Sequence, residues 1–146
     1  MVWNNVTGTA VKDVAAATAG QVWAGNDNGS PVTSLSLALS SAELPLTDAS
    51  TTNWNMANGY NAIWTLTGNH MLAAPTNPIV GRTYILRVAQ DSTGGRIPTL
   101  PGSTIFNFMG AGAPTFSTGA NLFDVISLYC YNASTPAFIA TFIKGS

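Results

Sequence analysis

Few side chains in this sequence could carry acid–base or metal chemistry. His70 is the single histidine and Cys130 the single cysteine. A cluster of histidines around a metal is therefore excluded, and a Cys–His nucleophile would need these two residues side by side. Cys130 belongs to an apolar, strand-like stretch, which predicts a buried and unreactive thiol. We expect neither a cofactor nor a metal.

The six acidic residues lie singly along the chain, with no closely spaced pair of the kind that glycosidases use. Acids far apart in sequence can still meet in a fold, so their spacing alone is a weak argument against hydrolysis. Together with the scarcity of histidine and cysteine, it predicts a protein that is not an enzyme.

Asp124 stands out among the acids because it interrupts an apolar stretch. A buried carboxylate costs free energy unless it is paired. The candidate partners are Arg82, Arg87 and Arg96, which all belong to the segment 77–102. We predict a structural ion pair between Asp124 and one of these arginines, either between strands or between subunits.

The segment 77–102 is the clearest local pattern that could position these arginines. Apolar and polar side chains alternate over 83–88, which is typical of a strand. The turn formers of 91–95 include two adjacent glycines, and the chain resumes at 96–98. The pattern predicts a β-hairpin with a glycine-containing loop.

Strand-like stretches recur about every ten residues from Leu44 onward, with no amphipathic helix between them. This spacing predicts an all-β body over 42–146, an antiparallel β-sandwich of jelly-roll type. The segment 1–41 supplies no core of its own, and we expect it to form an extended N-terminal arm. Its apolar anchors are Trp3, Trp23, Leu35, Leu37 and Leu39. The alternative is that the three leucines form the first strand of the sandwich.

The last two predicted strands, 122–131 and 137–143, are apolar on both faces. A strand with one solvated face should alternate apolar with polar residues. Either the arm covers the second face, or the face is buried between subunits. We assign five residues to an oligomer interface: Phe123, Tyr129, Tyr131, Ile139 and Ile143.

Charged residues make up only 8% of the chain, against about 25% in an average soluble protein. Subunit contacts over much of the surface would explain this, as would a surface rich in hydroxyl groups. The net charge is −1, without the basic patch that nucleic-acid binding needs. No apolar run is long enough to span a membrane, and the N-terminus lacks the pattern of a signal peptide. We therefore expect assembly in a cytoplasm.

One set of residues between Ala49 and Lys144 forms a pattern known from a family of proteins. It consists of Trp54, the segments 65–69 and 81–96, Pro101, Pro114, the strand around 124–126 and the final aromatic strand. In these residues the chain resembles a β-structured module of tailed-bacteriophage virion proteins, found in head decoration (cement) proteins and tail fibres. The resemblance implies homotrimers on a virion. One departure is 97–101, where a tryptophan-rich strand would be expected.

Two functions follow as expectations. The first is a structural virion protein that decorates or cements a capsid, with the major capsid protein or other virion proteins as partners. The second is a tail-fibre or receptor-binding tip that contacts host surface glycan through aromatic rings. The aromatic residues considered for that role are Trp3, Trp23, Trp54, Tyr60 and Trp64, of which most are expected to be core or interface anchors.

Overall fold

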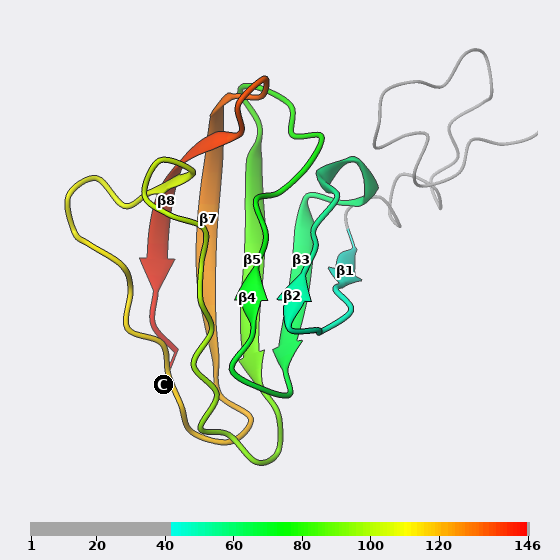
Figure 1. Ribbon diagram of the computed structural model, residues 1–146, viewed down its shortest axis with the longest axis vertical. Helices are drawn as coiled ribbons and strands as arrows, with labels where there is room; N and C mark the ends of the chain where they lie inside the picture. Colours follow the sequence, from blue (N-terminus) through cyan, green and yellow to red (C-terminus); the bar gives the residue numbers. More distant parts are fainter. Residues whose placement is uncertain (1–41, 146) are drawn as a thin grey trace, which may run out of the picture.

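The computed structural model describes residues 42–145, and these residues form strands, one short 3-10 turn and long connections (Figure 1). The predicted arm, 1–41, lies outside the described residues. The elements are β1 (Glu43–Pro45), β2 (Thr51–Thr52), η1 (Met56–Asn58), β3 (Asn61–Leu66), β4 (Met71–Leu72), β5 (Thr83–Gln90), β6 (Phe106–Asn107), β7 (Phe123–Asn132) and β8 (Ala137–Ile143). The all-β prediction is confirmed for this part of the chain.

Six of the strands form one mixed sheet in the order β1-β3-β5-β7-β8-β6. The pairs β5–β7 and β7–β8 are antiparallel, whereas β1–β3, β3–β5 and β6–β8 are parallel. The prediction of an antiparallel sheet is therefore wrong for three of the five strand pairs in this sheet.

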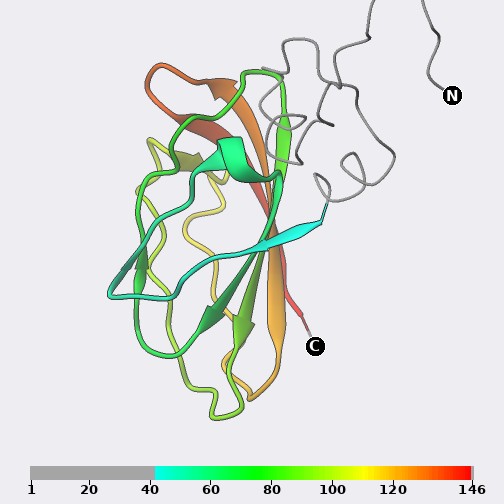
Figure 2. The same ribbon diagram turned by 90° about the vertical axis from the view of Figure 1, so that its right-hand side faces the viewer.

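The remaining strands, β2 and β4, pair with each other in parallel and form a second, smaller layer. Figure 2 shows this layer and the long connections on one side of the six-stranded sheet. Along the chain, β1, β3 and β5 alternate with β2 and β4, so consecutive strands belong to different layers. The strand spacing predicted an antiparallel sandwich, but each return through the second layer makes the next strand of the large sheet parallel.

The predicted hairpin after β5 does not form. Residues 96–100 leave the sheet and run beside β4, where Thr99 forms a bridge with Met71. The Thr99 amide donates to the His70 carbonyl at 2.9 Å, and the Thr99 carbonyl accepts from the Leu72 amide at 2.9 Å. The side chain of Gln90 fixes the position at which the chain leaves the sheet, because its amide donates to the Arg96 carbonyl and its oxygen accepts from the Arg96 amide.

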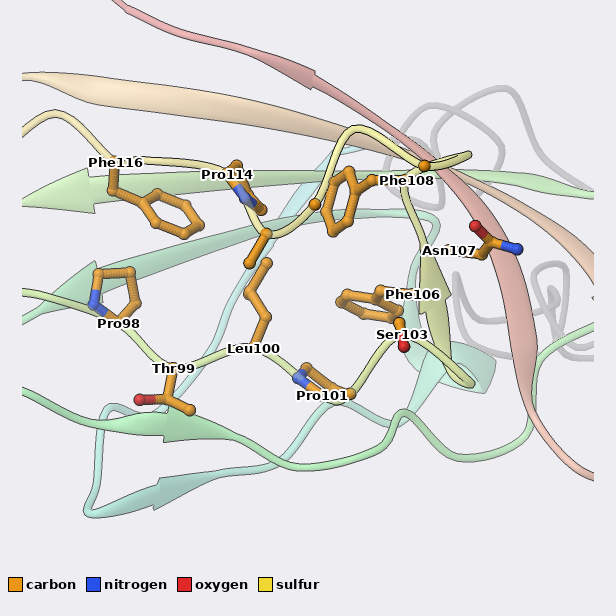
Figure 3. Close-up of a pocket in the computed structure, with 14 residues that line it drawn as sticks. Pro98, Thr99, Leu100, Pro101, Ser103, Phe106, Asn107, Phe108, Pro114 and Phe116 are labelled. Carbon is orange, nitrogen blue, oxygen red and sulfur yellow. The ribbon is translucent and has the colours of Figure 1, made fainter.

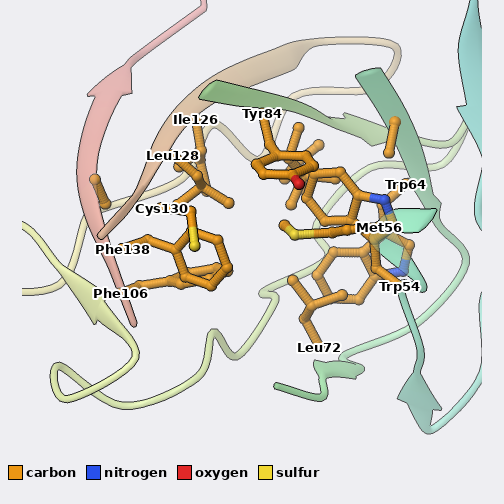
Figure 4. Close-up of a cluster of buried hydrophobic side chains, with 14 of the residues drawn as sticks. Trp54, Met56, Trp64, Leu72, Tyr84, Phe106, Ile126, Leu128, Cys130 and Phe138 are labelled. Carbon is orange, nitrogen blue, oxygen red and sulfur yellow. The ribbon is translucent and has the colours of Figure 1, made fainter. Parts of the chain in front are cut away.

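The core lies between the two layers and is built around aromatic rings (Figure 4). Trp54, Tyr84, Phe106 and Phe138 are almost fully buried. Tyr84 makes edge-to-face contacts with Trp54 and Phe138, with ring centroids 6.0 and 6.3 Å apart. Such pairs add about 0.5–1.5 kcal/mol each beyond the area they bury. Trp64 is also buried, so two tryptophans considered for sugar stacking belong to the core.

Candidate interaction surface

Strand β7 divides its side chains cleanly between the core and solvent. Asp124, Ile126, Leu128 and Cys130 are all buried. Three large side chains on the opposite face remain exposed, with exposed fractions of 46% for Phe123, 45% for Tyr129 and 47% for Tyr131. The period of two in an extended chain accounts for this split, which agrees with the faces assigned from the sequence.

Strand β8 extends the exposed apolar surface. Ile139 lies opposite Tyr129, and Ile143 lies opposite Val125, in the antiparallel register. Their exposed fractions are 38% and 61%. The outer patch, as we call it, consists of Phe123, Tyr129, Tyr131, Ile139 and Ile143. No part of residues 42–145 buries these side chains, and grouped apolar side chains of this size mark interaction sites on soluble proteins.

Within the part of the chain that the structure describes, one ion pair borders the outer patch. The Arg87 guanidinium donates from Nε to Glu43 Oε1 at 2.9 Å and from its terminal nitrogen to Glu43 Oε2 at 2.6 Å. These hydrogen bonds, together with the positive charge of Arg87, hold the pKa of Glu43 below its ordinary value although burial opposes the shift. The Arg87 Cζ atom lies 5.4 Å from the centroid of the Phe123 ring. Arg87 therefore joins the charged edge of the sheet to the apolar patch.

The predicted ion pair of Asp124 is replaced by hydrogen bonds. Asp124 is buried, as expected, but its carboxylate accepts from the Ser117 amide at 2.7 Å, the Ser117 hydroxyl at 2.8 Å and the Gly145 amide at 2.8 Å. Three donors can stabilise a buried carboxylate without a counter-charge. Asp124 thus fastens the segment around Ser117 and the C-terminal segment to β7.

The three arginines proposed as partners of Asp124 make other interactions. Arg87 pairs with Glu43, as described above. The Arg96 terminal nitrogen donates to Asp91 Oδ2 at 3.0 Å, within the turn that follows β5. The Arg82 Cζ atom lies 5.1 Å from the Tyr60 ring centroid. Two of the three therefore bind acids that are exposed or close to the surface, where an ion pair has a small desolvation cost.

Asp48 is a second hydrogen-bond centre, half-buried, which the sequence pattern did not indicate. Its carboxylate accepts from Trp64 Nε1 at 2.6 Å, from the Thr67 amide at 2.7 Å and from the Thr67 hydroxyl at 2.8 Å. His70 Nδ1 lies 2.9 Å from the same carboxylate. Burial of the carboxyl raises its pKa, but the hydrogen bonds from these three residues outweigh burial and leave the pKa below its ordinary value of 3.8.

The two residues considered for nucleophilic chemistry have separate partners. His70 contacts Asp48, whereas the Cys130 thiol donates to the Asn132 carbonyl at 3.4 Å. Burial raises the pKa of the Cys130 thiol, which opposes formation of a reactive thiolate. Among the described residues, no three histidine, cysteine or acidic side chains come together as a metal site. None of the helices in residues 42–145 is long and apolar enough to cross a membrane.

A groove opens beside the edge strand β6, between 98–103 and 106–116 (Figure 3). Its volume is about 510 Å³, within the usual range for binding cavities. The apolar rings that line it come from three prolines and three phenylalanines, and none of its lining residues is charged. We call this site the proline groove. The rings that line it are those of Pro98, Pro101, Phe106, Phe108, Pro114 and Phe116.

Comparison with known proteins identified no relative of this chain. We found no matching family model, no similar curated protein and no similar solved structure. The outer patch and the proline groove are therefore interpreted from their own geometry and chemistry.

Proposed function

We propose that this chain is a structural virion protein of a tailed phage that decorates or cements the capsid surface as a homotrimer. The observation that carries the proposal is the exposed outer patch on β7 and β8. Leaving these side chains exposed to water costs about 25 cal/mol of free energy for each Å² of apolar surface. Burying the patch against another copy removes that cost, as in obligate homo-oligomers.

The composition supports the same proposal. A chain in which only 8% of the residues are charged has few surface charges, and copies of it repel one another little. The Glu43–Arg87 pair satisfies its own charges at the border of the patch, so a neighbouring copy need not supply a counter-charge. We further propose that the two packed layers are a reduced form of the jelly-roll-like sandwich, and that the segment 1–41 attaches the body to the major capsid protein or another virion protein.

A receptor-binding tip on a tail fibre is the second candidate. The observation that favours it is the exposure of two tyrosine rings, Tyr129 and Tyr131, whose faces could stack on a host glycan. Trp54 and Trp64 are buried and cannot serve this purpose, and Trp3 and Trp23 lie outside the described residues. The candidate thus depends on the same patch being open rather than buried between copies.

Cryo-electron microscopy of the virion that carries this chain tests both candidates. We expect three-fold clusters of the body on the capsid surface, with β7 and β8 facing the neighbouring copy. Density for the body at the end of a tail fibre, with the outer patch open to solvent, would favour the receptor-binding tip. A virion without the body on either structure would refute both candidates.

A further inference from the structure

The proline groove has a chemical character that restricts its occupant. Its walls are proline and phenylalanine rings, and Thr99, Ser103 and Asn107 supply its polar side chains. A groove without a charged side chain offers no partner for a charged ligand and favours an uncharged, apolar one. The rings labelled in Figure 3 face a common space, so side chains entering from one direction would meet apolar surface on several sides.

One wall of the groove is β6, which lies at the edge of the six-stranded sheet. Edge strands accept extended segments, whose alternate side chains then enter pockets on one face. An occupant matched to this site would be extended and uncharged, with apolar side chains at every second position.

The chain itself contains such a segment. The stretch 28–41 has no charged residue and carries Leu35, Leu37 and Leu39 at alternating positions. In an extended conformation the three leucines would lie on one face, about 7 Å apart. The segment therefore matches the groove in charge, polarity and periodicity.

The covalent length of the chain limits which copy can supply all three leucines. Strand β1 begins at Glu43 and lies at the opposite edge of the sheet from β6. Five strand spacings separate the two edges, about 24 Å. The four residues from Leu39 to Glu43 span at most about 14 Å when fully extended. Leu39 therefore cannot reach the groove of its own body, and all three leucines can dock there together only if a second copy supplies the segment.

We propose that the proline groove is the docking site for the segment 28–41 of a second copy of this chain. The inference rests on the homo-oligomer proposed above and names a contact within it. It assigns Leu35, Leu37 and Leu39 to a contact between subunits. Trp3 and Trp23 are then the residues that would attach the protein to the particle. Docking an extended segment costs conformational entropy, which a preformed groove partly offsets.

Disulfide trapping on the full-length chain tests the proposal. One sample carries Leu37→Cys, and the other carries Ser103→Cys and a tag that changes its mass. Ser103 lines the groove and is exposed, so a bound leucine segment would bring position 37 within disulfide distance. The matched control is Ser92→Cys, an exposed serine outside the groove. Cys130 is buried and stays unchanged in every sample.

After mixing and mild oxidation, we expect the mixed disulfide-linked dimer in about fivefold higher yield with Ser103→Cys than with Ser92→Cys, because docking raises the effective concentration of the two thiols. Equal yields would overturn the proposal. A link that forms only within one chain of a Leu37→Cys/Ser103→Cys double variant would overturn it as well.

Light scattering on the same samples before oxidation separates this inference from the proposed homo-oligomer. Oligomers without the 37–103 link would refute the groove contact and leave the oligomer in place. Monomers without the link would refute both.

Discussion

Tyr129 and Ile139 lie directly opposite each other on β7 and β8, and both side chains are exposed on the outer face of the sheet. Cross-strand apolar pairs stabilise a sheet by about 0.2–1 kcal/mol, but this pair leaves much of its surface in water. The pair is the centre of the outer patch and the most direct target for testing the proposed oligomer.

The first prediction concerns association. We expect Ile139→Arg to convert the proposed homotrimer into monomers, because an unpaired charge would be buried in the contact. Light scattering at micromolar concentration measures the change. The matched control is Ile97→Arg, which places the same charge at a more exposed isoleucine outside the patch and should leave the trimer intact. A trimer that survives Ile139→Arg would show that the outer patch is not the contact.

The second prediction concerns the carboxylate of Asp124. Both carboxylate oxygens of Asp124 accept hydrogen bonds from Ser117 or Gly145. In Asp124→Asn one of these oxygens is replaced by an amide NH₂ group, which faces a donor and cannot accept its hydrogen bond. We expect a loss of about 2–4 kcal/mol in the free energy of unfolding, measured by denaturant melts.

The matched control for this substitution is Asp91→Asn. The Oδ1 atom of Asp91 accepts both backbone hydrogen bonds of its turn, and an asparagine oxygen can keep them. Only the contact of Oδ2 with Arg96 is lost. The loss of stability should therefore be clearly smaller than for Asp124→Asn, and equal losses would show that Asp124 is not a buried hydrogen-bond centre.

The third prediction separates backbone strain from steric fit in the turn after β5. Gly94 and Gly95 both have positive φ, at 69° and 76°. A Cβ atom on Gly94 would lie 2.6 Å from the Ala120 nitrogen, whereas one on Gly95 would meet nothing within 4 Å. Gly95→Ala should cost about 1 kcal/mol through strain alone.

Gly94→Ala should cost at least about 2 kcal/mol more than Gly95→Ala, because the backbone of 118–120 must move away. Thermal melts of the two variants, compared at the same protein concentration, measure the difference. Equal melting temperatures would contradict the close packing of the turn against this segment.

The fourth prediction concerns acid stability and Asp48. The folded-state pKa of Asp48 is below its ordinary value of 3.8, so the carboxylate stabilises the fold at higher pH. That stabilisation is complete well above pH 3.8 and disappears as the pH falls through the folded-state pKa. Asp48→Asn should therefore cost about 2–4 kcal/mol at neutral pH and progressively less in acid.

Denaturant melts of the wild type and of Asp48→Asn, from about pH 6 to about pH 2, give the difference at each pH. We expect the two stabilities to converge as the pH is lowered. A difference that stays constant over this range would show that the charge of Asp48 does not contribute.

Some properties of this protein follow from the sequence alone. The alternation in 122–131 was enough to separate the buried from the exposed face of β7, because side chains in a strand point to opposite faces in turn. The same local pattern indicated that Asp124 and Cys130 are buried. These properties depend only on residues close together in the sequence, so the local pattern is sufficient to predict them.

The tertiary structure decided the strand order and the hydrogen-bond partners of Asp48 and Asp124. Local periodicity identifies a strand but does not say which layer it joins, so the separate layer of β2 and β4 could not be predicted from it. Asp48 contacts Trp64 and His70, which lie 16 and 22 residues further along the chain. Asp124 likewise meets Gly145 after 21 residues. Such contacts depend on how the whole chain packs, because each donor is brought into place by a different strand or connection.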